Sequence, residues 1–143
     1  TYYKDPIHEK NIKPTANPHW DWFVDDAINR LAGMCYLSKE IHGGTGFYRN
    51  KILDIYHMNK RDAVRGVKDE EFGKKLKPYE KKRLVNKSCD KFELLKLIPM
   101  KWNRFILYDA DLLHSMYIED EEFYKKHRRI TTNCFLFYKT KNK

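Results

Sequence analysis

The sequence predicts a mainly β protein in which short antiparallel strands form a sandwich or a barrel. Runs rich in β-branched and aromatic residues recur along the 143 residues, and turn-forming residues separate them. These runs do not alternate with long helical patterns, which argues against parallel βαβ units. The composition shows no second zone, and the chain contains no internal repeat. We therefore expect a single domain over residues 1–143.

The first two expected strands follow each other closely. Residues 30–38 (RLAGMCYLS) are apolar and end in polar residues, and GGTGFYRNK comes soon after with two glycines suited to a tight hairpin. We expect these two strands to pair as neighbours. Residues 51–58 (KILDIYHM) alternate loosely and are expected to continue the second strand.

A charged segment interrupts the β pattern between residues 59 and 90. It has few branched apolar residues, and Pro78 suits the first turn of a helix over residues 79–87. We expect a basic, partly helical and mostly exposed insertion. Strand-like runs then return as FELLKLIPM, NRFILYD and RITTNCFLFYK, at residues 92–100, 103–109 and 129–139.

The composition argues against several classes of protein. The formal net charge is +9, but the lysines are spread along the chain, so we favour a solvated basic surface over a nucleic-acid footprint. Three cysteines without a CxxC pair argue against a disulfide framework or a zinc knuckle, and they favour a reducing, cytoplasmic compartment. We expect Cys35 and Cys134 to be small core residues. We find no signal peptide and no apolar run near the roughly 18 residues of a membrane span.

The stretch NPHWDWF suggests a metal site. In a strand, His19 and Asp21 project from one face while Trp20 and Trp22 pack on the other. His114 follows the turn after an apolar strand and offers a third ligand. Two histidines and one carboxylate form the facial triad of non-haem Fe(II) oxygenases. On spacing alone, the alternative is that these histidines are surface or satisfied core residues.

The motifs around these residues resemble a known enzyme family. HWDWFVDDAINRLAGMCYLSKEIHGGTGFY and PMKWNRFILYDADLLHSMYIEDEEFYKKHRRITTNCFLFY are similar to the two halves of the prolyl-hydroxylase-like branch of the 2-oxoglutarate and Fe(II) dependent oxygenases. The likeness is greatest to a bacterial and phage-associated subgroup that carries GGTxFYR and NRxxLYxxxLxHS. It covers roughly residues 17–138.

The resemblance implies a double-stranded β-helix, the jelly roll of cupin-like proteins, and a dioxygenase activity. It assigns the Fe(II) ligands to His19, Asp21 and His114. It assigns the distal carboxylate of 2-oxoglutarate to Arg129, with a hydroxyl of Tyr36 beside it. The implied reaction uses molecular oxygen to oxidise a C–H bond and releases succinate and carbon dioxide. The substrate is left open as a small molecule, a peptide or a nucleic acid.

Two features depart from the family pattern. The insertion at residues 59–90 is long for the family, and fewer than twenty residues precede the HxD motif, where relatives have another strand and supporting helices. The sequence also opens on Thr1, so we expect either that the family's amino-terminal part is missing or that this is a trimmed version of the fold.

The last expected strand gives an arginine an inward position. Arg129, Thr131 and Asn133 share one face of this strand, and a buried guanidinium needs a partner such as a carboxylate. A slip of one residue would select Arg128 instead. We favour Arg129 because the apolar residues that follow continue its alternation. The alternative is that Arg129 belongs to the exposed run KKHRR.

Other readings stay open at this point. Trp22 and Tyr48 are candidates for the substrate mouth, with core packing as the alternative. A catalytically silent jelly-roll binding module would keep the fold without holding iron. A basic nucleic-acid-binding protein would use the insertion at residues 59–90.

Overall fold

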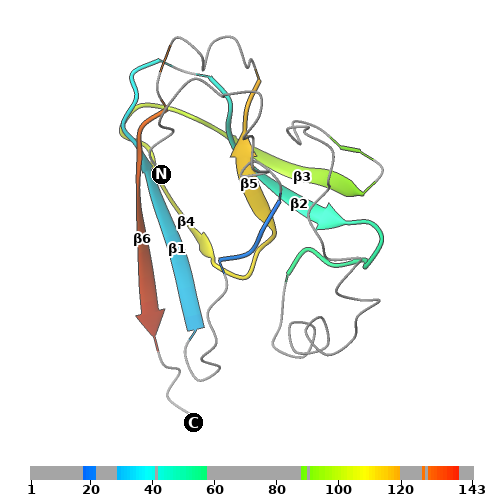
Figure 1. The fold of residues 1–143 in the computed structure, drawn as a ribbon. Coiled ribbons are helices and arrows are strands. Elements are labelled where there is room, and N and C mark those ends of the chain that lie inside the picture. The colour runs from blue at the N-terminus through cyan, green and yellow to red at the C-terminus, as the bar shows by residue number, and fades with distance from the viewer. Residues whose placement is uncertain are drawn as a thin grey trace, which may run out of the picture.

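The structure is a computed structural model that describes residues 18–21, 29–40, 42–57, 88–89, 91–119, 127 and 129–138. These residues form a mainly β, antiparallel structure of two sheets (Figure 1), as the sequence predicts. None of the described segments is an apolar helix of the length that a membrane crossing requires. The expected insertion at residues 59–90 lies outside the described residues, except for Ser88 and Cys89.

Each sheet has three antiparallel strands. The order in one sheet is β4-β1-β6, and the order in the other is β3-β2-β5. The run HSMY of β5 carries little β-branched or aromatic signal and was not expected as a strand. The strands are β1 (Asn29–Tyr36), β2 (Gly44–Asn50), β3 (Phe92–Pro99), β4 (Phe105–Asp109), β5 (His114–Tyr117) and β6 (Thr131–Tyr138).

The expected hairpin between the first two strands is wrong, because β1 and β2 lie in different sheets. The two glycines serve a close backbone contact instead. Gly43 has a positive φ of 67°, and its carbonyl accepts a hydrogen bond from the backbone N–H of Met100. Gly44 pairs with Pro99 of β3, where a Cβ on Gly44 would overlap the carbonyl oxygen of Ile98. Only a residue without a side chain fits there.

The second strand also ends earlier than expected. β2 stops at Asn50, whose side-chain oxygen accepts hydrogen bonds from the backbone N–H groups of Ile52 and Leu53. Such an Asn bond turns the chain locally and competes with strand pairing. Residues 51–54 therefore form a turn, and Ile55 returns to bridge Asn50. The expected continuation of the strand through residues 51–58 is wrong.

The inner faces of the two sheets meet through side chains of β1, β2 and β4. The hydroxyls of Tyr36 and Thr45 are 2.6 Å apart, and the rings of Phe47 and Tyr108 meet edge to face at 5.1 Å. On the other face of β2, Tyr48 is buried in a cluster with Phe92 and Leu113. The central strand β2 is thus covered on both faces.

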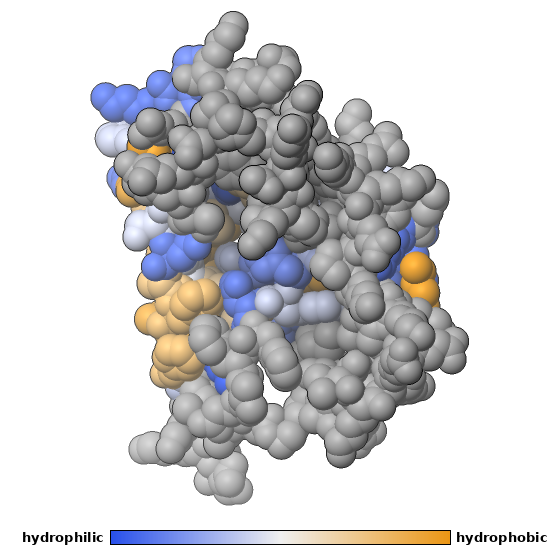
Figure 2. All heavy atoms as spheres, in the orientation of Figure 1, coloured by the Kyte–Doolittle hydropathy of each residue, from blue (hydrophilic) through white to orange (hydrophobic). Residues whose placement is uncertain are grey.

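The outer face of the β4-β1-β6 sheet is apolar and exposed (Figure 2, on the side where β6 and β1 lie). Register places Cys134 opposite Gly33 on this outer face, with Phe105 beside them. Cys134 is exposed and Cys35 is only half-buried, so the expectation that both are core residues is wrong. Large exposed side chains of this sheet include Phe105, Leu107, Leu136 and Tyr138.

We expect Gly44→Ala to destabilise the fold by about 2 kcal/mol or more, because the new Cβ meets rigid backbone at Ile98. Gly33→Ala is the matched control. Its Cβ would meet only the side chains of Cys134 and Phe105, which are exposed and free to shift, so a cost of about 1 kcal/mol is expected. Urea unfolding of both variants measures the difference. An equal or smaller loss for Gly44→Ala would contradict the close approach.

Candidate metal centre

A backbone bridge joins the two histidines of the expected triad. The N–H of His19 donates to the carbonyl of His114 at 2.8 Å, and the N–H of His114 donates back at 3.0 Å. Paired residues of an antiparallel bridge project from the same face. The two imidazole rings therefore lie together, with centroids 4.7 Å apart.

The carboxylate of the HxD motif reaches the same point. The backbone N–H of Asp21 donates to the carbonyl of Ala110 at 3.2 Å, which holds the segment beside the turn before β5. The carboxylate of Asp21 lies 3.4 Å from Nε2 of His114. Between the two ligands, Trp20 points the other way and packs against the cluster of Tyr48, Phe92 and Leu113. The alternation expected for this stretch is thus present at residues 19–21.

The three side chains form a group that could hold one metal ion. One donor atom from each of His19, Asp21 and His114 lies within 4.8 Å of the others. Ligands about 2.0–2.2 Å from a single ion lie no more than about 4.4 Å apart, so a small side-chain rotation completes the geometry. Three ligands on one side of an ion would leave the remaining positions open.

The protonation of His114 suits a metal ligand. Burial lowers the pKa of His114, and the neighbouring His19 lowers it further. The ring is therefore neutral near pH 7. Its Nδ1 lies 2.8 Å from the carbonyl of Leu112, so the N–H at Nδ1 donates there and Nε2 is left as the donor to a metal.

A second polar group lies on the same inner faces, around Arg129. This arginine is only 7% exposed. Its Nη2 donates to the carbonyl of Gly44 at 3.2 Å, and the guanidinium lies 5.6 Å from the ring centre of Tyr36. Nη2 also lies 3.7 Å from the sulfur of Met34. The inward position expected for Arg129 is therefore present, whereas Arg128 lies outside the described residues.

The hydroxyls of Tyr36 and Thr45 complete this polar group. Burial raises the pKa of Tyr36, although the hydrogen bond to Thr45 and the charge of Arg129 oppose the rise. Tyr36 therefore keeps its proton and can donate it to an anion. Thr45 was not singled out from the sequence, although it stands within the quoted GGTxFYR motif.

Tyr108 connects the two groups and was also missed. Its ring packs on His114 with centroids 4.9 Å apart. Burial raises the pKa of Tyr108, with contributions from the charge of Asp21 and from Tyr36, and Arg129 lowers it. One phenol thus interacts with both the histidine–aspartate group and the arginine group. The signal was the tyrosine in the NRxxLYxxxLxHS motif.

Of the two aromatic candidates for the substrate mouth, the structure describes Tyr48, which is buried. Tyr48 is 1% exposed and belongs to the core cluster, where burial raises its pKa to about 12. The alternative for Tyr48, packing in the core, is confirmed. Trp22 lies outside the described residues.

The lowered pKa of His114 predicts a pH effect on stability. In the unfolded chain, His114 binds a proton near the ordinary histidine pKa of about 6.5, whereas in the folded protein the pKa of His114 is lower. The free energy of unfolding should therefore fall as the pH drops from about 7.5 to about 5.5. In thermal melts with a chelator present, Tm should depend less on pH in His114→Gln than in the wild type. His127→Gln, at an exposed site, is the control. Parallel profiles for wild type and His114→Gln would contradict the prediction.

Comparison with known proteins adds one finding. No curated protein and no solved structure matches the chain. One family model matches residues 10–136, and its description states no function. Because the match covers most of the 143 residues, this protein belongs to the family of unknown function DUF6445.

Proposed function

We propose that this protein is a non-haem Fe(II) and 2-oxoglutarate dependent dioxygenase with a double-stranded β-helix fold. The observation that carries the proposal is the convergence of His19, Asp21 and His114 on inner faces that also hold a buried arginine. A histidine–carboxylate triad of this composition is typical of mononuclear iron oxygenases. The two opposed antiparallel sheets are compatible with a jelly roll.

The residues of the chain fit the proposed metal. His114 presents Nε2 because its Nδ1–H is held by the carbonyl of Leu112. Asp21 supplies one negative charge, and its backbone is held through Ala110. Bound Fe(II) would supply the activation of oxygen for oxidation of a C–H bond, while the chain orients the ligands.

The arginine group fits a dicarboxylate cosubstrate. A guanidinium presents a planar pair of donors that matches a carboxylate, and at Arg129 the charge is shielded from solvent. The hydroxyls of Tyr36 and Thr45 add neutral donors beside it. The ring of Tyr108 packs on His114, and the pKa of its phenol responds to Tyr36 and Arg129, so the two groups are near enough to suit one bound molecule that reaches both.

The class of substrate stays open within this proposal. The enzyme is proposed to act in a reducing, cytoplasmic setting, which its free Cys35, Cys89 and Cys134 suit. A catalytically silent binding module on the same fold is the competing proposal. Succinate formed from 2-oxoglutarate by the Fe(II)-loaded protein, in the presence of oxygen, separates the two. No succinate from a protein that binds both Fe(II) and 2-oxoglutarate would favour the binding module.

We expect the double variant His19→Ala with His114→Ala to lose one equivalent of Fe(II) relative to the wild type. A lone carboxylate cannot enforce the facial geometry that two imidazoles and Asp21 provide. Anaerobic equilibrium dialysis measures the stoichiometry. The control is His127→Ala, which removes an exposed imidazole elsewhere and should leave the stoichiometry unchanged. Equal iron binding by the double variant and the wild type would remove the proposed metal site.

Arg129→Ala should weaken 2-oxoglutarate binding by about 30-fold to a few thousand-fold. Truncation of one partner in a buried charge pair costs on the order of 2–5 kcal/mol, at about 1.4 kcal/mol per decade of affinity. Arg129→Lys should recover only part of the loss, because a point charge lacks the paired donors. Isothermal titration in the presence of Fe(II), without oxygen, measures the affinity.

Two further arginines serve as controls for this measurement. Arg49→Ala removes an exposed guanidinium that pairs with Asp54, and it should change the affinity little. Arg128→Ala tests the neighbouring position in the sequence. Equal, small losses for Arg128→Ala and Arg129→Ala would show that a basic surface had been mistaken for a cosubstrate site.

A further inference from the structure

A second group of metal-ligating side chains lies beside the turn between β4 and β5. It consists of His57, Asp109 and Asp111, and one donor atom of each lies within 4.8 Å of the others. Nε2 of His57 is 3.6 Å from Oδ2 of Asp109. None of the three belongs to the His19–Asp21–His114 triad, and no motif in the sequence pointed to them.

The backbone holds these three residues in fixed positions. His57 forms a bridge with Leu112, and the N–H of Leu113 donates to the carbonyl of Tyr56 at 2.8 Å. In the turn itself, the N–H of Asp111 donates to the side chain of Asp109 at 3.1 Å. The donors therefore converge without a large rearrangement of the chain.

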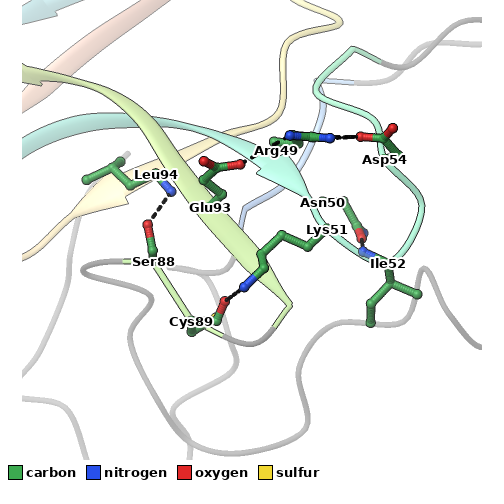
Figure 3. Close-up of polar contacts among 9 residues, drawn as sticks. All are labelled: Arg49, Asn50, Lys51, Ile52, Asp54, Ser88, Cys89, Glu93 and Leu94. Carbon is green, nitrogen blue, oxygen red and sulfur yellow. Dashed lines mark hydrogen bonds and ion pairs between the residues drawn. The ribbon is translucent and has the colours of Figure 1, made fainter.

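The segment that carries His57 is itself anchored to β2 (Figure 3). Asn50 accepts hydrogen bonds from the N–H groups of Ile52 and Leu53, and its backbone pairs with Ile55. At the same turn, Arg49 forms an ion pair with Asp54 and approaches Glu93 of β3 at 3.5 Å. These contacts set the direction in which residues 55–57 leave the sheet.

The second group combines two carboxylates with one imidazole. Two carboxylates face each other in a chain whose formal net charge is +9. Within the part of the chain that the structure describes, no side chain forms a hydrogen bond or ion pair with the carboxylate of Asp111. Burial and the neighbouring Asp109 raise the pKa of Asp111, while His57 and Arg30 oppose the rise. A cation held between the two carboxylates, whose oxygens lie within 4.8 Å of each other and of the imidazole, would reduce their mutual repulsion.

We propose that His57, Asp109 and Asp111 form a second divalent-cation site, which stabilises the turn that carries the first. One imidazole and two carboxylates suit Mn²⁺, Fe²⁺ or Zn²⁺, and the two carboxylates neutralise the ion. The site does not depend on the proposed oxygenase function, because none of its ligands takes part in that function.

The turn links the two sites physically. The carbonyl of Ala110 accepts the backbone hydrogen bond of Asp21, and the carbonyl of Leu112 lies within hydrogen-bond distance of the His114 ring. Both carbonyls belong to the segment between Asp109 and His114. A cation held by Asp109 and Asp111 limits the motion of this segment, so it orders the ligands of the first site.

Mn²⁺ binding to three proteins tests the proposal, with equilibrium dialysis as the measurement. The wild type should bind two equivalents. The double variant His57→Ala with Asp111→Asn should bind one, and so should His19→Ala with His114→Ala. Glu40→Gln, which removes an exposed carboxylate elsewhere, should bind two. Circular dichroism shows whether each variant is folded.

Asp111→Asn alone keeps the shape of the turn and provides a second, milder test. It should lower the affinity for the second equivalent of Mn²⁺ at least tenfold. In the wild type, Mn²⁺ about tenfold above its Kd should raise Tm by about 5 °C, and this rise should shrink in Asp111→Asn. Unchanged affinity and an unchanged rise in Tm would overturn the second site.

The outcomes separate this inference from the proposed function. If His57→Ala with Asp111→Asn binds as much Mn²⁺ as the wild type, the second site is wrong and the triad is untouched. If that variant binds none while His19→Ala with His114→Ala keeps one equivalent, the second site stands and the proposed iron site falls.

Discussion

The pair of backbone hydrogen bonds between His19 and His114 is the constraint on which the candidate site depends. It attaches a short segment from near the start of the chain to β5. The bridge sets the two imidazoles side by side, and the next contact, from Asp21 to Ala110, brings the carboxylate to them. If the segment of His19 separated from β5, the three candidate ligands would move apart although the residues themselves were unchanged.

The alternation of the HWD stretch performs two tasks at once. His19 and Asp21 face the β4–β5 turn and His114, while Trp20 packs on the buried cluster of Tyr48 and its neighbours. Burial of a large aromatic side chain contributes a few kcal/mol at most, but here it fixes the orientation of the two ligands as well. Packing on one face of the β3-β2-β5 sheet therefore supports the arrangement of the candidate ligands on the other.

Burial keeps several ionisable side chains near Arg129 uncharged. It lowers the pKa of His114 and raises the pKa of Tyr36 and of Tyr108, so all three are neutral near pH 7. In such a setting the charge of Arg129 is screened less than at the surface. Beside this positive charge lie the hydroxyls of Tyr36 and Thr45, which are neutral hydrogen-bond donors.

Local patterns in the sequence were enough to predict a mainly β, antiparallel chain. The expected strands near residues 92–100, 103–109 and 129–139 correspond to β3, β4 and β6, because β-branched and aromatic alternation is a property of neighbouring residues. The same pattern could not identify β5, whose strand character comes from pairing with β2 and with His19. It also misplaced β1 and β2 as a hairpin, because the choice between one sheet and two depends on contacts such as Tyr36 with Thr45.

The sequence by itself determined the residue types of the site, since the HxD spacing, His114 and Arg129 can all be named from local motifs. Only the tertiary structure decided that they meet, because a contact between residues far apart in the chain depends on which strands pair. The tertiary structure also added Tyr108 and brought His57 to Asp109 and Asp111, which lie about fifty residues further along the chain. It moved Tyr48 into the core and Cys134 onto the surface, since burial depends on which face of a strand another layer covers.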